Sequence, residues 1–424
     1  MTKLDEKDIL VYADWIEIEK PLLIGILNSS VLRGKEIFAF EYDSLWLNNR
    51  NIRALDPSLQ LFKGRQFVPQ GHSNFGLFLD SSPDRWGRFL MKRREAHLAR
   101  EEKRPERRIF ESDYLLGVHD EYRMGGIRFK LNHDGSFLDD NEKMASPPMT
   151  SLRELEQASL AIESKDSESS KDYGKWLKML IAPGGSLGGA RPKASVIDGH
   201  NQLWIAKFPS RYDDIDVGAW EMLAYQLGKS VGIEMAEAKL KRFNSENHTF
   251  LSKRFDRTQG NNRVHFASAM TLLQRKDGDD AASGVSYLHL AEFLMREGAE
   301  PDRDLQQLWQ RILFFVCISN VDDHLRNHGF LLQDKGWVLS PAYDINPVPY
   351  SDGLKLNISE SDNTQSLELV KSVAPFFRIS KNKADALIDE MLQIIKVWRK
   401  KATQLGISQT EQARMASAFR VTDN

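Results

Sequence analysis

The sequence has little cysteine, no long hydrophobic run and no excess of charge of one sign. Cys317 is the only cysteine among 424 residues, so no disulfide can form within the chain. The longest apolar runs, such as Ile312 to Ile318, are far shorter than the roughly 20 residues of a membrane-spanning helix. The formal net charge of −2 excludes a global basic field for nucleic acids. With acidic residues near the start, where a secretory signal is basic, these absences predict a cytoplasmic protein.

Length and hydrophobic periodicity predict three parts. A chain of 424 residues exceeds what one hydrophobic core usually serves. A region of short strands, one helix and a final strand leads to a connector rich in Asp, Ser, Asn and Pro. A strand-rich region follows, and then a mostly helical one. The predicted parts are residues 1–148, 149–260 and 261–424. Helices are predicted at residues 76–104, 217–232, 287–297, 304–319 and 384–405.

The most unusual group of polar residues follows a predicted buried helix, in residues 318–332 (ISNVDDHLRNHGFLL). Asp322 and Asn327 stand five apart, as do the Asp and Asn of the protein-kinase catalytic loop, which orient the attacking hydroxyl and hold Mg²⁺. We expect a hairpin next, with Asp344 at the end of its second strand. Carboxylate and carboxamide oxygens suit Mg²⁺. The sequence therefore predicts that these three side chains converge on one ATP.

Two other interpretations of this loop stay open. Asp and Asn are common turn residues, so the same spacing taken alone is usually an Asx-rich turn. A metal-hydrolase cluster would use Asp322, Asp323, His324 and His328, although adjacent Asp residues in one loop rarely bind the same metal. An upstream Gly-rich segment and a strand Lys favour the kinase interpretation.

The Gly-rich segment, residues 182–193 (APGGSLGGARPK), lacks the Walker A pattern. Its glycines would let backbone N–H groups face phosphate oxygens, although an ordinary turn is the common alternative. Lys207 is predicted in the middle of the apolar strand LWIAKFP, where its charge needs phosphates or Glu221 as a partner; a Lys that reaches solvent is the alternative. Residues 253–257 (KRFDR) would offer backbone groups to an adenine edge or form a structural Arg–Asp network.

The segments GGSLGGARPKA, IAKFP, KRFDR, SNVDDHLRN and SPAYDINPVPY stand in the order found in the HipA toxin kinases of bacterial toxin–antitoxin systems, which the chain resembles over nearly its whole length. The resemblance implies a bilobal protein-kinase-like α+β fold with a β-rich small lobe, an all-α large lobe and an N-terminal α+β subdomain. It also implies ATP and Mg²⁺ as cofactors. Ser186 falls at the family's autophosphorylated serine, whose modification ejects the Gly-rich loop and switches the kinase off; a turn serine is the alternative.

The resemblance also implies the role of each site residue. Asp322 would be the catalytic base, Lys207 would contact the nucleotide phosphates, and Asn327 with Asp344 would hold the metal. The implied nucleotide-binding residues are Gly188, Gly189, Ala190, Arg191, Lys193, Lys207, Lys253, Arg254, Phe255, His324, Asn327, Tyr343 and Asp344. Arg191 and Pro192 stand where the family often has Gln followed by Glu or Asp.

The resemblance implies a protein substrate, such as an aminoacyl-tRNA synthetase, and a separate helix-turn-helix antitoxin through which DNA is bound indirectly. A small-molecule or lipid kinase would keep the chemistry and change the acceptor. A non-catalytic subunit of a DNA complex would use residues 85–108 as a basic arm. Interspersed acids make a solvated, salt-bridged helix the other interpretation of that segment; they are Glu95, Glu101, Glu102 and Glu106.

Overall fold

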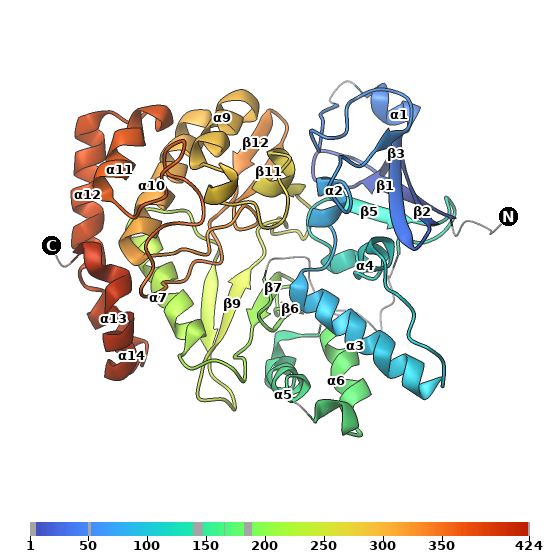
Figure 1. Cartoon of the computed structure of the whole chain (residues 1–424), viewed down its shortest axis with the longest axis horizontal. Coiled ribbons are helices and arrows are strands. Elements are labelled where there is room, and N and C mark those ends of the chain that lie inside the picture. The colour runs from blue at the N-terminus through green and yellow to red at the C-terminus, as the bar shows by residue number, and fades with distance from the viewer. Residues whose placement is uncertain (1–5, 50–51, 139–146, 165, 182–188, 423–424) are drawn as a thin grey trace. The chain divides into compact units, whose positions relative to one another are not determined.

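The computed structural model describes residues 6–49, 52–138, 147–164, 166–181 and 189–422. The chain forms two units, one of residues 1–211 with 256–267 and one of residues 212–255 with 268–424 (Figure 1). This division does not follow the boundaries predicted near residues 148 and 260, and the three-part organisation stays a prediction. None of the described helices has the length and apolar character needed to cross a membrane.

The first unit begins with a five-stranded antiparallel sheet in the order β4-β3-β2-β1-β5. Its inner face packs aromatic rings, with Phe78 of the adjoining helix α2 5.7 Å from Phe40 and 6.1 Å from Phe129. A Cβ at Gly25 would lie 2.2 Å from the backbone oxygen of Glu41, so only glycine fits there. The strands are β1 (Glu6–Ala13), β2 (Leu22–Leu32), β3 (Lys35–Tyr42), β4 (Gln66–Phe67) and β5 (Ile127–Lys130).

The helix predicted at residues 76–104 is two helices, because Pro83 and the capping residue Asp84 interrupt it. The Asp84 side chain accepts a hydrogen bond from the Gly87 N–H and starts α3. The helices of this unit are α1 (Ser44–Leu47), α2 (Gly76–Asp80), α3 (Arg85–Glu101), α4 (Glu111–Leu116), α5 (Leu152–Ile162) and α6 (Tyr173–Ile181). An antiparallel hairpin of β6 (Lys193–Ile197) and β7 (Leu203–Lys207) follows.

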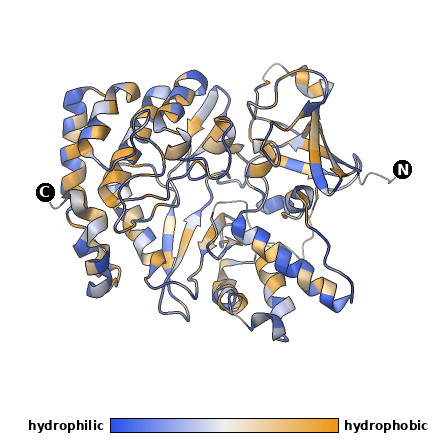
Figure 2. Cartoon of the chain, in the orientation of Figure 1, coloured by the Kyte–Doolittle hydropathy of each residue, from blue (hydrophilic) through white to orange (hydrophobic). Residues whose placement is uncertain are grey.

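Helix α3 is polar along most of its length, as its colouring in Figure 2 shows. Arg88 bonds both carboxylate oxygens of Glu111, at 2.6 and 2.7 Å. Arg104 pairs with Glu95 and Glu102 at 2.5 Å. The basic segment is therefore ion-paired and helical over Arg85–Glu101, although its Glu95 is buried and not solvated.

The second unit is mostly helical around α10. Residues Ile312 to Ile318 of α10 are all buried, and the helix packs against α9, α11 and α12. The unit contains α7 (Val217–Ser230), β8 (Ala238–Lys241), β9 (Thr249–Lys253), α8 (Ala269–Leu272), α9 (Tyr287–Glu297), α10 (Pro301–Ile318), β11 (Gly329–Gln333), β12 (Gly336–Leu339), α11 (Leu367–Val373), α12 (Lys381–Ile395), α13 (Trp398–Gln404) and α14 (Gln409–Met415). The short strand β10 (Phe266–Ser268) lies where the two units join in sequence.

The mixed α and β content agrees with the predicted fold class, and α9 has the predicted bounds. The helix predicted at residues 384–405 is wrong in one respect, because a turn at Lys396 and Val397 divides it. That turn lets Trp398 stack on Phe419, with ring centroids 4.2 Å apart and planes 10° from parallel.

Candidate functional site

Helix α10 is capped by Ser319, which has a left-handed conformation with φ 51°. The Asp322–Asn327 loop follows this residue. Hydrogen bonds within the loop fix Asn327. Its N–H donates to the His324 oxygen at 2.8 Å, and its side-chain Nδ2 donates to the Asp322 backbone oxygen at 2.7 Å. The Asn327 Oδ1 atom is buried and has no hydrogen-bond partner among the described residues. A buried acceptor of this kind needs a partner, and a cation would provide one.

Asp344 lies outside a strand, contrary to the prediction, because β12 ends at Leu339 and Pro341 has no N–H with which to extend the ladder. Asp344 has a φ of 56°. Hydrogen bonds on both sides of Asp344 join its segment to the Asp322–Asn327 loop region. The Tyr343 hydroxyl donates to the Arg326 oxygen at 2.7 Å, and the Asn346 N–H donates to Asn320 Oδ1 at 3.0 Å. The structure therefore brings Asp344 beside the loop that carries Asp322 and Asn327.

Asp323 supports the loop from inside. It is fully buried, accepts a hydrogen bond from the Lys355 N–H at 2.9 Å and is bonded by the Tyr287 hydroxyl. Burial raises the pKa of Asp323 to about 7.

His328 is equally internal and lies against Tyr287, with ring centroids 5.5 Å apart. Burial lowers the pKa of His328 to about 3, and its Nε2 lies 3.2 Å from the Asp323 backbone oxygen. Within the described ranges, no three His, Cys, Asp or Glu side chains form a group suited to a metal. The burial of Asp323 and His328 and their hydrogen bonds within the core are what the metal-hydrolase interpretation does not predict.

Lys253 is the last residue of β9, and Arg254 and Phe255 follow it in the same unit. The Phe255 ring lies 5.3 Å from that of Tyr343, beside Asp344. The Lys253 N–H donates to the Glu237 oxygen at 2.7 Å, and Arg254 is buried. A hollow next to Asp344 measures about 10 Å³ and includes Phe250 and Tyr343 in its lining. This hollow is far smaller than the roughly 300 Å³ or more of a small-molecule pocket.

The first unit holds the other predicted residues that the structure describes: Gly189, Ala190, Arg191, Lys193 and Lys207. Lys207 was predicted in the middle of its strand, but it is the last residue of β7. Its side chain is half-buried. Lys193 is buried, and its ammonium lies 2.8 Å from Asp84 Oδ2. Ser186 and Gly188 lie outside the described residues.

Asp84 was not predicted to take part in this region. The helix-capping pattern Ser-Pro-Asp ahead of α3 gives no information on a Lys that follows 109 residues later.

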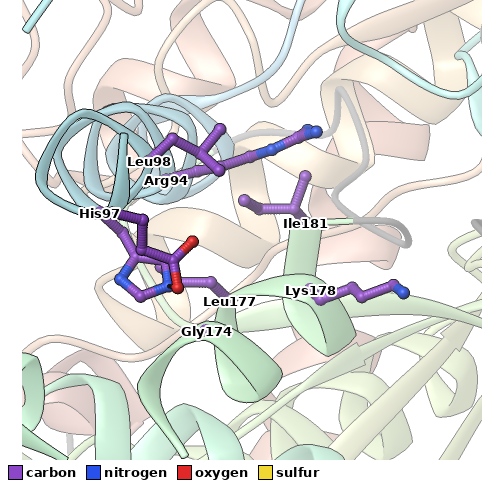
Figure 3. Close-up of a pocket in the computed structure, with 8 residues that line it drawn as sticks. Arg94, His97, Leu98, Gly174, Leu177, Lys178 and Ile181 are labelled. Carbon is purple, nitrogen blue, oxygen red and sulfur yellow. Dashed lines mark ion pairs between the residues drawn. The ribbon is translucent and has the colours of Figure 1, made fainter. Parts of the chain in front are cut away.

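A larger cavity, of about 360 Å³, lies between α3 and α6 (Figure 3). Arg94 and Lys178 line it together with apolar Leu98, Leu177 and Ile181. None of the predicted nucleotide or metal residues that the structure describes lines this cavity.

A buried helix that ends in an Asp-x-x-x-x-Asn loop, with a further Asp beside the loop, is an arrangement typical of phosphoryl-transfer proteins. Residues 185–398, just over half of the chain, match the family model described as "HipA-like C-terminal domain". The chain belongs to this family.

Two curated relatives are similar to part of the chain. A "Putative kinase" of Haemophilus influenzae is 28% identical over 187 residues, which cover 39% of this chain and 54% of the relative. "Putative kinase Y4mE" of Sinorhizobium fredii is 25% identical over 155 residues, which cover 35% of each chain. The chain thus spans about half or less of the length of these relatives.

A solved structure is similar over nearly the whole chain. It is the Shewanella oneidensis complex of HipA, HipB and operator DNA, in which the matching chain has a TM-score of 0.67 and 16% identity, with 98% of this chain and 95% of the other covered. This similarity shows that the chain has the HipA fold.

Proposed function

We propose that the chain is an ATP- and Mg²⁺-dependent serine/threonine protein kinase. The observation that supports this most directly is the pair of hydrogen bonds around Asp344. Tyr343 is hydrogen-bonded to Arg326 and Asn346 to Asn320, and these bonds join the segment of Asp344 to the loop region that carries Asp322 and Asn327. These are the oxygen-bearing residue types that phosphoryl transfer requires.

Asp322 is the proposed catalytic base. Its side chain is 74% exposed, as a group that must meet a hydroxyl of another molecule needs to be. Asp322 orients a serine or threonine hydroxyl toward the γ-phosphate and accepts its proton as the new O–P bond forms, while the bond from the γ-phosphorus to the β–γ bridging oxygen breaks and ADP leaves. The Asn327–Asp322 hydrogen bond holds the Asp322 backbone in place for this step.

Asn327 and Asp344 are the proposed metal ligands. The buried Asn327 Oδ1 that has no hydrogen-bond partner in the described residues, together with a carboxylate, fits a hard cation such as Mg²⁺. When bound, Mg²⁺ neutralises phosphate charge. Lys207 is proposed to contact the phosphates. The other proposed nucleotide contacts are Gly188, Gly189, Ala190, Arg191, Lys253, Arg254, Phe255, His324 and Tyr343.

The proposed partners follow from family membership and from the neighbouring structure, which contains HipB and operator DNA. We expect a separate helix-turn-helix antitoxin, and DNA bound only through it. The proposed substrate is a translation component such as an aminoacyl-tRNA synthetase. Ser186 is the proposed autophosphorylation site.

The test is incubation of purified protein with γ-labelled ATP, Mg²⁺ and host lysate. The proposal expects labelled proteins, with labelling lost in Asp322→Ala. Label found only in a small molecule or lipid would favour the kinase with a different acceptor. ATP left intact, with salt-sensitive DNA binding by the chain alone, would favour the non-catalytic subunit.

A further inference from the structure

Lys193 and Asp84 form a buried ion pair inside the first unit. The Lys193 Nζ lies 2.8 Å from Asp84 Oδ2, and the two side chains are 3% and 4% exposed. Two charges removed from water to this degree hold each other in place, because loss of either one leaves the other buried and uncompensated.

Further bonds join the start of α3 to the end of the Gly-rich segment. The Trp86 indole N–H donates to the Lys193 backbone oxygen at 3.1 Å. The Lys193 ammonium also lies 3.4 Å from the Gly189 oxygen, and Gly189 has a φ of 95° that favours glycine. Asp84 itself is held, because its Oδ1 accepts from the Gly87 N–H at 2.8 Å. The first turn of α3 therefore fixes Lys193 through both its side chain and its backbone.

Lys193 and Lys207 are directly paired across the β6–β7 hairpin, so their side chains leave the same face of the sheet. Like charges at directly opposed positions repel each other. The Asp84 carboxylate offsets the charge of Lys193 at this position.

We propose that Asp84 and Lys193 are positioning residues of the nucleotide site: the pair anchors the end of the Gly-rich segment to α3, and Lys193 is not a phosphate ligand. This inference rests on the proposed kinase function. It assigns a part in nucleotide binding to a residue of the N-terminal part of the chain, 109 positions before Lys193.

The test is a double-mutant cycle of Asp84→Asn and Lys193→Met in the full chain, read by the fluorescence of N-methylanthraniloyl-ATP with Mg²⁺. Each single variant leaves one buried charge uncompensated and should weaken binding by about tenfold or more. The double variant removes both charges and should recover most of that loss. Asp113→Asn is the matched control, because it removes a more exposed ion pair, with Lys7 at 3.0 Å, from the same unit.

If Lys193 contacts phosphate, Lys193→Met and the double variant will lose equal affinity, and Asp84→Asn alone will not weaken binding. That result would overturn the inference. If the wild-type chain binds no nucleotide, the proposed function fails. Melting temperatures of the wild type, the two single variants and the double variant then decide whether the Asp84–Lys193 pair anchors its segment to α3. If the pair is an anchor, each single variant should have a lower melting temperature than the wild type, and the double variant should recover most of that loss. A double variant without recovery would contradict the anchoring role.

Discussion

The side chains of Asp322 and Asn327 differ in their surroundings, although they belong to one loop. Asp322 is 74% exposed, whereas Asn327 is 7% exposed and bonds the Asp322 backbone at 2.7 Å. An exposed carboxylate is available to a protein substrate, and a buried amide oxygen is available to a metal. This difference separates the roles of base and ligand that we assign to the two residues.

Replacing Asp322 should remove activity and leave the fold intact. In Asp322→Ala the loop keeps its hydrogen bond, because Asn327 is bonded to the backbone oxygen of residue 322. We expect phosphate transfer to fall by about 10²–10⁴-fold and the free energy of unfolding to change by less than about 0.5 kcal/mol. Labelling assays and urea denaturation measure the two quantities. Asp389→Ala on α12, which changes another exposed Asp, serves as the control.

Asp323 should make stability depend on pH. Its pKa is raised to about 7 in the folded chain, so the folded state binds more protons than the unfolded state between about pH 4 and pH 7. The stability that this carboxyl contributes is fully present below its unfolded pKa and is lost as pH rises through about 7.

In Asp323→Asn this loss should disappear, so the unfolding free energy of the variant should gain on that of the wild type as pH rises. The lowered pKa of His328, about 3, acts in the opposite direction but is common to both proteins. Urea denaturation across this pH range measures the difference, and a difference that does not change with pH would contradict the assignment.

At the scale of elements, hydrogen bonds hold the segment after β12 to the loop after α10. The Tyr343 hydroxyl supplies one of them, at 2.7 Å from the Arg326 oxygen. Because the proposed base Asp322 and the proposed metal ligand Asp344 lie on these two segments, the relative position of the segments should affect catalysis more than stability.

Tyr343→Phe therefore should lower kcat by about tenfold and stability by only about 1 kcal/mol. Tyr350→Phe is the control, because Tyr350 is 77% exposed. Steady-state kinetics and thermal denaturation distinguish the two effects. Equal kcat values for the two variants would show that the bond at Tyr343 does not position the site.

Sequence patterns predicted the elements whose signal is local. Apolar residues spaced three and four apart predicted the bounds of α9 correctly, and the spacing of Asp322 and Asn327 predicted the position of the loop. The strand predicted to reach Asp344 was wrong, since β12 ends at Leu339 and the next segment is held by tertiary hydrogen bonds. The Asp84–Lys193 pair was missed because a contact across 109 residues leaves no periodic pattern in either segment.

At the scale of the whole molecule, family membership and fold are shown by different observations. The match of residues 185–398 shows the family, whereas the 16% identical HipA structure shows the fold over 98% of the chain. Regulation is proposed from Ser186, which lies outside the described residues.

Ser186→Ala should leave ATP binding intact and abolish self-inhibition. Activity of the wild type should decline during incubation with ATP as Ser186 is modified, and activity of the variant should not. A time course with phosphopeptide mapping measures both. Identical time courses for the two proteins would show that Ser186 does not cause self-inhibition.

We propose that Asp322, Asn327 and Asp344 act together on one metal-bound nucleotide. Transfer of the γ-phosphate from labelled ATP to protein, measured with Mg²⁺ and with excess chelator, tests it most directly. We expect transfer that requires Mg²⁺ and that falls by about 100-fold or more in Asp322→Ala, Asn327→Ala and Asp344→Ala, each still folded by circular dichroism. Transfer at the wild-type rate in any of these folded variants would contradict the claim.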